Sequence, residues 1–507
     1  MGKGNSLAGR GIRYIRKHGI MQLYRKVMER RLQNQMERPY SRWLQEQQPD
    51  EAQLQAQRAR QFEKSPKISV LVPTYETPEE FLRQMVESLC DQTYGNWELC
   101  IADGSCSDLV KETLQPYMER DDRIRYQKLE KNLGISENTN AALAMATGEW
   151  IGLLDHDDIL YPQTLYEIAA AMEAHPEAEA FYTDEDKISF DLQEHFQPHF
   201  KPDFNRELLR SNNYICHFFV VKYEIAREIG GFSSAFDGAQ DYDFILRCTE
   251  KAREVCHIPQ ILYSWRCHAS STAANPESKL YAYEAGKRAV AAHLQRAGEA
   301  ARVLDTDNYG FYRVRYDGWE EVAGGVSGID GQEKISILRN SFEKIHGQNS
   351  INVVYYDKAC NKIVTFGKKD GTQGYVLFTH VKKGLLSADF FRELLSTCDR
   401  PGVGMVCARV YEKSGRLAHQ LEMAGVNNPF GQTMKGLKKG YLGYFHRACL
   451  QQEVVQATDC FLMKAELFEQ VSSSISGETL DVQQLTQQVR KLGYAVVYDP
   501  WAVLYEK

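Results

Sequence analysis

Between positions 66 and 190, short apolar runs typical of strands alternate with segments whose apolar residues recur at helical spacing. Short runs rich in apolar, β-branched and aromatic residues predict strands, and the first run, "ISVLVP", is nearly continuous, as in a strand buried on both faces. Apolar residues at helical spacing between these runs predict helices. The predicted strands are residues 66–75, 97–105, 124–129, 149–158 and 178–188, and the predicted helices are residues 78–90 and 136–146. This order predicts an α/β fold with a doubly wound, mainly parallel sheet.

The same pattern divides the 507-residue chain into four parts. A basic N-terminal segment and a Gln-rich linker cover residues 1–64, and the alternating strands and helices cover residues 65–300. A Gly- and Asp-rich stretch, 301–333, is interpreted as a linker, and strand–helix order resumes over residues 334–507. We therefore expect a second, smaller α/β domain after the first.

The second half repeats the pattern of the first without its acids. "GYVLFTHVKKGLLSADFFRELLS", from Gly374, echoes "GEWIGLLDHDDILYPQTLYEIAA", from Gly148. Where the first copy has a run of aspartates, the second has Thr379 to Lys382 with no carboxylate, and near the C-terminus Asp481 alone stands where the first copy has two aspartates. This predicts a degenerate repeat that binds an acceptor, forms a homodimer or docks to a partner enzyme; the alternative is that both halves merely share βα patterning.

The N-terminal segment is amphipathic. Its apolar residues from Ile20 to Leu32 recur at helical spacing, with lysines and arginines on the opposite face. One interpretation is a helix in residues 10–33 that contacts an anionic membrane surface peripherally. The other is a helix packed on the protein or on a partner, with its charges in solvent.

Composition narrows the class of protein. The net charge of -7 is small for this length and excludes a general nucleic-acid binder. The 12 cysteines show neither CxxC nor Cys/His ligand spacing, which indicates reduced thiols rather than a disulfide framework or a zinc site. With no signal-peptide core and no apolar run of membrane-spanning length, the sequence predicts a cytoplasmic protein.

Polar residues gather where the predicted strands end, and parallel α/β sheets bind ligands beyond those ends. The strand "WIGLL" is followed by Asp155, Asp157 and Asp158. Acids this close repel one another unless a cation neutralises them, and Mg²⁺ or Mn²⁺ takes oxygen ligands from carboxylates and substrate phosphates. The alternative is that Asp155 caps a helix and the other acids are solvated. The dinucleotide fingerprint GxGxxG and the P-loop are both missing.

The order of these motifs resembles the family 2 glycosyltransferases with the GT-A fold, over about residues 66–275. "ISVLVPTYETPEEFLRQMVESLCDQTY", "WELCIADGSCSD" and "NLGISENTNAALAMATGEWIGLLDHDD" carry the resemblance. It implies that a nucleotide-sugar donor contacts Pro73, Thr74, Tyr75, Asp103, Asn140, Asp155, His156 and Arg266. It also implies a metal held by Asp155, Asp157 and His268. Segments "YTDEDKI" and "SNNYICHF", with Asp184, Glu185, Asp186, Asn213 and His217, are expected on the acceptor side; surface acids and a polar loop are the alternative.

The stretch "GFSSAFDGAQDYDFILRC" resembles the part of this family that carries the catalytic base. Asp241 is the expected base and Asp243 the second candidate, with helix capping as the alternative role for either. One base on the acceptor face implies inversion at the anomeric carbon, without a covalent intermediate. The resemblance therefore implies a metal-dependent inverting enzyme that moves a sugar from a UDP or dTDP donor to a glycan or lipid-linked acceptor in surface polysaccharide synthesis, at the inner face of the membrane.

Two other functions use the same type of fold. A non-catalytic scaffold or glycan-binding protein would need none of the acids, so the presence of Asp155, Asp157 and Asp241 favours an enzyme. A nucleotidyltransferase would have a Gly- and Arg-containing phosphate loop after the first strand, but "VPTYETPEEF" has neither. A partner glycosyltransferase remains a candidate for what the second domain contacts.

Overall fold

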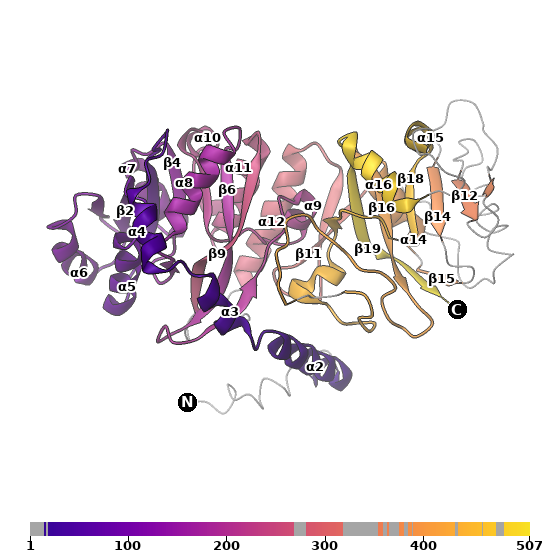
Figure 1. Cartoon of the computed structure of the whole chain (residues 1–507), viewed down its shortest axis with the longest axis horizontal. Helices are drawn as coiled ribbons and strands as arrows, with labels where there is room; N and C mark the ends of the chain where they lie inside the picture. The colour runs from indigo at the N-terminus through magenta and orange to yellow at the C-terminus, as the bar shows by residue number, and fades with distance from the viewer. Residues whose placement is uncertain are drawn as a thin grey trace.

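The structure of the chain is a computed structural model. It describes residues 15–16, 19–267, 280–317, 353–357, 362–364, 375–379, 384–387, 389–430, 434–458, 460–472 and 481–506. Residue 334, where the second domain is predicted to begin, lies outside these ranges. Two large sheets lie at opposite ends of an elongated chain, with α12 (Leu280–Arg296) and β11 (Tyr312–Tyr316) between them (Figure 1).

The first sheet has the strand order β3-β2-β1-β4-β8-β6-β9-β5, with β7 paired to β6. Its strands are β1 (Ile68–Thr74), β2 (Trp97–Asp103), β3 (Ile124–Lys128), β4 (Trp150–Leu153), β5 (Ile159–Leu160), β6 (Ala180–Ser189), β7 (His195–His199), β8 (Phe219–Lys222) and β9 (Val255–Cys267). Strands β3, β2, β1 and β4 are parallel, and β8 joins antiparallel to β4. The predicted strands and the α/β fold are confirmed.

Helices cover both faces of this sheet because apolar side chains alternate along its strands. On β1, Leu71 packs in one core while Val70 and Val72 pack in the other, as the two-residue period of a strand requires. The helices are α5 (Glu79–Cys90), α6 (Leu109–Met118), α7 (Ile135–Met145), α8 (Thr164–Ala174), α9 (Arg206–Ser211), α10 (Tyr223–Glu228) and α11 (Gln240–Lys251). Helices α5 and α7 match their predictions, whereas α6 escaped prediction, because Pro116 interrupts its helical signal.

The second sheet repeats the arrangement of the first. Its order is β13-β12-β14-β18-β16-β19-β15, with β17 paired to β19. The segment β12-β14-β18-β16-β19-β15 has the same sequence of parallel and antiparallel pairs as β1-β4-β8-β6-β9-β5. The echo predicted from the sequence therefore holds at the level of topology.

We call the first sheet with its helices the first unit, and the second sheet with its helices the second unit. Its strands are β12 (Val353–Asp357), β13 (Lys362–Val364), β14 (Tyr375–Thr379), β15 (Gly384–Leu386), β16 (Val403–Tyr411), β17 (Gln452–Glu453), β18 (Cys460–Lys464) and β19 (Ala495–Glu506). Its helices are α14 (Phe390–Cys398), the 3₁₀ segment η4 (Tyr444–Cys449), α15 (Ala465–Ser472) and α16 (Val482–Lys491). Asp481 caps α16 by accepting a hydrogen bond from the backbone of Gln483.

The stretch predicted as a linker is structured at its start. Strand β10 (Ala301–Asp305) pairs antiparallel with β11. Tyr312, Val314 and Tyr316 of β11 are buried in the same hydrophobic core as Leu71 of β1. The prediction of a plain connection is therefore wrong for this part, because alternating apolar side chains on β11 form one face of a hairpin.

The N-terminal helix α2 (Ile20–Met36) contacts the second unit through Glu29 and projects from the body of the chain (Figure 1). The carboxylate of Glu29 accepts hydrogen bonds from the backbone N–H groups of Leu442 and Gly443. Ile20 and Tyr24 remain exposed, with exposed fractions of 71% and 58%. None of the helices in the described ranges has the length and apolar character that crossing a bilayer requires. Membrane contact by residues 10–33 stays a prediction.

Candidate active site

The carboxyl ends of β1 and β2 lie side by side, with Thr74 opposite Asp103. Asp103 is fully buried and accepts hydrogen bonds from the Ser105 backbone (2.9 Å), the Tyr126 hydroxyl (2.8 Å) and the Lys128 ammonium (3.0 Å). Burial by itself would raise the pKa of Asp103, but these donors outweigh it and lower the pKa. Asp103 is thus an ionised anchor of the loop, while Tyr75, 50% exposed, presents a ring that a nucleotide base could contact.

The three acids after β4 have three different environments. Asp158 is fully buried and accepts hydrogen bonds from the Tyr263 hydroxyl and from the backbone N–H of Arg266 (2.8 Å). Burial, together with repulsion from Asp157 and Asp155, raises the pKa of Asp158 well above its usual range. Asp157 is partly buried, and the side chain of Asp155 is 52% exposed. The hydrogen bonds of Asp158 therefore hold the loop after β4 against β9, whereas the side chain of Asp155 is partly exposed to solvent.

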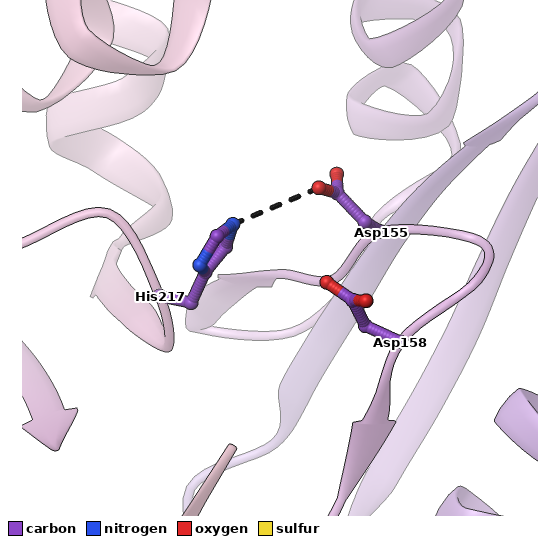
Figure 2. Close-up of side chains that lie close together, drawn as sticks. All are labelled: Asp155, Asp158 and His217. Atoms are coloured by element: carbon purple, nitrogen blue, oxygen red, sulfur yellow. Dashed lines mark ion pairs between the residues drawn. The ribbon is translucent and has the colours of Figure 1, made fainter. Parts of the chain in front are cut away.

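His217 is placed against Asp155 by the direction of β8. Because β8 is antiparallel to β4, the residues just before β8 lie at the edge where β4 ends. His217 Nε2 lies 3.6 Å from Asp155 Oδ2, and its Nδ1 lies 3.2 Å from Glu185 Oε2. Figure 2 shows the imidazole pointing toward Asp155, with Asp158 beside them. The ring also stacks on Tyr263, with 4.5 Å between centroids.

The charge around His217 favours its protonated form in the metal-free protein. Burial alone would lower its pKa, but contact with Cys216, Asp155 and Glu185 outweighs burial and raises the pKa well above the ordinary value. Oxygen of Asp155, oxygen of Asp158 and nitrogen of His217 lie within 4.8 Å of one another. A carboxylate and an imidazole whose other nitrogen contacts a carboxylate form a donor set that fits a divalent cation.

Asp241 reaches the same site from the start of α11. Its Oδ2 accepts a hydrogen bond from the Asn213 side-chain amide (2.9 Å) and lies 4.0 Å from the Cys216 sulfur. Cys216 in turn lies 3.5 Å from His217 Nε2. Burial raises the pKa of Asp241, while His217 and Asn213 act in the opposite direction. A carboxylate with a raised pKa suits proton abstraction.

Asn213→Ala tests this placement through the pH profile. The amide donates to the charged carboxylate of Asp241, so its loss should raise the pKa of Asp241 further. Since a hydrogen bond to a charged group contributes about 1.5–3 kcal/mol and one pKa unit corresponds to about 1.4 kcal/mol, we expect the acid limb of kcat/KM to move up by about one pH unit. Asn212→Ala, whose side chain instead bonds Gly310, is the control. If the acid limb of the pH profile does not move in Asn213→Ala, the hydrogen bond from Asn213 does not set the pKa of Asp241.

Three of the predicted site residues have other partners. Both atoms of the Asn140 amide bond the backbone of Phe232, at 2.9 and 2.8 Å, so Asn140 joins α7 to a loop rather than being placed for a nucleotide. Asp243 is buried and pairs with Arg247 one turn along α11, which does not fit a base. The guanidinium of Arg266 bonds the carbonyl of Asp157 and the side chain of Gln84. His268 lies outside the described residues. These corrections arise because long-range partners occupy side chains that the motif alone leaves open.

The residues predicted on the acceptor side divide between two environments. Asp184 accepts from the backbone of Lys201 (2.7 Å), and Asp186 from Tyr40 (2.6 Å) and Ser264 (2.6 Å), so both are buried structural acids. Glu185, Asn213 and His217 instead surround Asp155 and Asp241. The sequence signal that separates Glu185 from Asp184 and Asp186 was the alternation of side chains along a strand, because successive side chains point to opposite faces. Cys216 was not predicted, and a single thiol carries no pattern that could have revealed it.

Comparisons with known proteins identify relatives of this chain. Residues 69–230 match the family model described as Glycosyl transferase family 2. The chain is 33% identical over 491 residues to the uncharacterised protein y4gI of Sinorhizobium fredii, which covers 88% of this chain and 53% of y4gI. It is 28% identical over 464 residues to the O-antigen biosynthesis protein RfbC of Myxococcus xanthus, covering 85% of this chain and 36% of RfbC. The chain thus spans about half the length of one relative and about a third of the other.

Among solved structures, residues 1–349 of TarS from S. aureus, in complex with UDP, match at 20% identity with a TM-score of 0.35. That match covers 45% of this chain and 65% of the TarS chain. The family match runs from β1 through α10 and contains Asp155, Glu185 and His217, while Asp241 follows just beyond it. The parallel strands and the family-model match together show that residues 69–230 form a glycosyl transferase family 2 domain, with the GT-A fold.

Proposed function

We propose that this chain is a metal-dependent, inverting glycosyltransferase that moves a sugar from a UDP or dTDP donor to a glycan or lipid-linked acceptor. One observation carries the proposal: Asp155 and Asp241, distant in the sequence, meet at one site through His217 and Cys216. Surface polysaccharide synthesis is the proposed setting, because relatives are described as an O-antigen biosynthesis protein and a chondroitin synthase of Pasteurella multocida.

The proposed chemistry is a single displacement. The acceptor hydroxyl donates its proton to Asp241 and attacks the anomeric carbon, while the bond from that carbon to the diphosphate oxygen breaks on the opposite face. Asp155 and Asp157, with His217, would hold a divalent cation, which supplies positive charge to the departing diphosphate. Tyr75 offers its exposed ring to the base of the nucleotide. With one carboxylate on the attacking side, the configuration inverts.

Calorimetric titration of UDP and dTDP, with and without Mn²⁺, tests the donor site. Wild type should bind one of them in a Mn²⁺-dependent way, and Asp155→Ala/Asp157→Ala should lose at least about a hundredfold in affinity, the upper end for disturbing a metal site. Asp122→Ala, an exposed acid that precedes β3 at the opposite edge of the sheet, is the matched control and should bind as wild type.

Two results would count against the proposal. If wild type binds neither nucleotide under any metal condition, the donor site is lost and a non-catalytic scaffold on the same fold becomes the better explanation. If the double variant binds as tightly as wild type, the acids after β4 do not hold the donor.

A further inference from the structure

The segment η4 of the second unit packs against β7 of the first unit, whose His199 contacts Glu185 of the candidate active site. Within η4, Phe445 and His446 have φ values of 45° and 61°. Non-glycine residues adopt this left-handed region rarely and at a cost, so the surrounding packing must hold them there. The ring of Phe445 stacks on the imidazole of His199 in β7, with 3.8 Å between centroids and 11° between the planes.

The same segment is hydrogen-bonded to the backbone on both sides of His199. The Tyr444 hydroxyl donates to the carbonyl of Pro198 (2.6 Å) and accepts from the N–H of Phe200 (2.9 Å). Arg447 donates to the carbonyl of Phe200 (2.7 Å). These bonds fix residues 198–200 from the second unit, so the stacking of Phe445 is a built contact and not a chance approach.

His199 transmits this contact to a carboxylate of the active site. Its Nδ1 lies 3.5 Å from Glu185 Oε1, and the other carboxylate oxygen of Glu185 lies 3.0 Å from the Lys201 ammonium. Burial lowers the pKa of His199 to about 3, so the ring is neutral and donates to Glu185 without adding charge. Glu185 is thereby held from two sides, and its Oε2 also contacts His217.

The contacts form a continuous path from the second unit to the donor site. Phe445 covers His199, His199 and Lys201 hold Glu185, Glu185 orients His217, and His217 faces Asp155. A carboxylate behind a metal-ligating histidine sets the orientation of its ring, and disturbing such partners weakens metal sites about 10- to 100-fold. No comparable acids exist at the end of β14, where Thr379 closes the strand.

We propose that the second unit, which lacks the acidic run found after β4, serves the first as a positioning element, and that Phe445 is the residue through which it sets His217 against Asp155. This inference rests on the proposed function, because it assigns the second unit a role in donor binding. The unit would then be retained for the shape of its η4 segment and not for a nucleotide site of its own.

Phe445→Ala should weaken Mn²⁺-dependent UDP binding about tenfold, the lower end for disturbing partners behind a metal ligand. Phe445→Trp should restore most of the affinity, because an aromatic face again covers His199. Phe430→Ala is the matched control: its ring packs on Tyr40, Trp43 and Phe200 in the same interface and has no ring contact with His199. The control should lose stability without losing nucleotide affinity.

Three outcomes would overturn the inference while leaving the proposed function intact. These are unchanged UDP binding in Phe445→Ala, equal weakening by Phe430→Ala, and no recovery in Phe445→Trp. If wild type itself binds no nucleotide, the ring nitrogen signals of His217 in ¹⁵N-histidine-labelled, metal-free protein still decide. They should shift in Phe445→Ala and stay in place in Phe430→Ala, and unshifted signals would refute the coupling. Phe445→Leu replaces the alanine variant if that variant fails to fold.

Discussion

Asp241→Asn should lower kcat for sugar transfer by about 10²- to 10⁴-fold, the usual contribution of a general base. Asparagine keeps the size of the side chain and a hydrogen-bonding partner for Asn213, but it cannot take up the hydroxyl proton. Donor affinity should change little, because the proposed role of Asp241 is toward the acceptor hydroxyl, and Cys216 and His217 lie between Asp241 and Asp155. Initial rates at saturating donor, together with nucleotide titration, separate the two effects.

Asp243→Asn is the matched control for this variant. The change is chemically identical and lies two residues away, but Asp243 is buried and paired with Arg247. It should lower the thermal stability and leave kcat of the folded fraction within a few-fold of wild type. A full rate for Asp241→Asn, or an equal loss in both variants, would remove Asp241 from the mechanism.

Arg400→Ala should destabilise the junction between the two units by about 3–5 kcal/mol, the usual cost of removing one partner from a buried ion pair. Arg400 is 9% exposed and binds both oxygens of Glu207, at 2.7 and 2.8 Å, and Glu299 at 2.9 Å. Its guanidinium also lies 4.0 Å from the ring centre of Tyr316. Without it, the buried Glu207 keeps its ion pair with Arg210 (3.1 Å). The urea midpoint at pH 7 measures the loss.

The same pair predicts how stability depends on pH. Burial would raise the pKa of Glu207, but Arg400 and Arg210 outweigh it and lower the pKa from 4.5 to about 2. A lowered pKa in the folded state means that the stabilisation is fully present above about pH 4.5 and is lost as the pH falls toward 2. In Arg400→Ala the folded-state pKa of Glu207 should be lowered less, so the pH-dependent loss of stability should be smaller and should be complete at higher pH. Arg302→Ala, which breaks an exposed pair with Asp317, is the control and should change little. Equal urea midpoints at pH 7 for wild type and Arg400→Ala would show that the ion pair between Arg400 and Glu207 does not stabilise the junction.

The fold of the first unit was readable from the sequence because its signals are local. The run Ile68–Thr74 is a strand buried on both faces, and the alternation of such runs with amphipathic helices permits few topologies. The acids after β4 could be placed at the ligand-binding edge for the same reason. The repeat in the second half was visible because the apolar pattern survived after the carboxylates had gone.

Tertiary structure alone decided what each polar residue does. Asp155 and Asp158 are three positions apart, yet one is half exposed and the other is buried, because Tyr263 and Arg266 of β9 donate hydrogen bonds to the carboxylate of Asp158. Likewise, Asn140 satisfied its family motif while its amide was taken by Phe232. Hydrogen bonds of this kind depend on which strands become neighbours, and nothing within a short stretch of sequence encodes that.

The role of the second unit shows the same division most clearly. Sequence determined that residues 334–507 carry a repeat without its acids, since hydrophobic periodicity and missing carboxylates are both local properties. That Phe445 lies on His199, and through Glu185 and His217 faces Asp155, was decided only by the folded chain. Periodicity determines which face of each element is buried, whereas the residues that meet across two packed units depend on the direction and register of strands far apart in the chain.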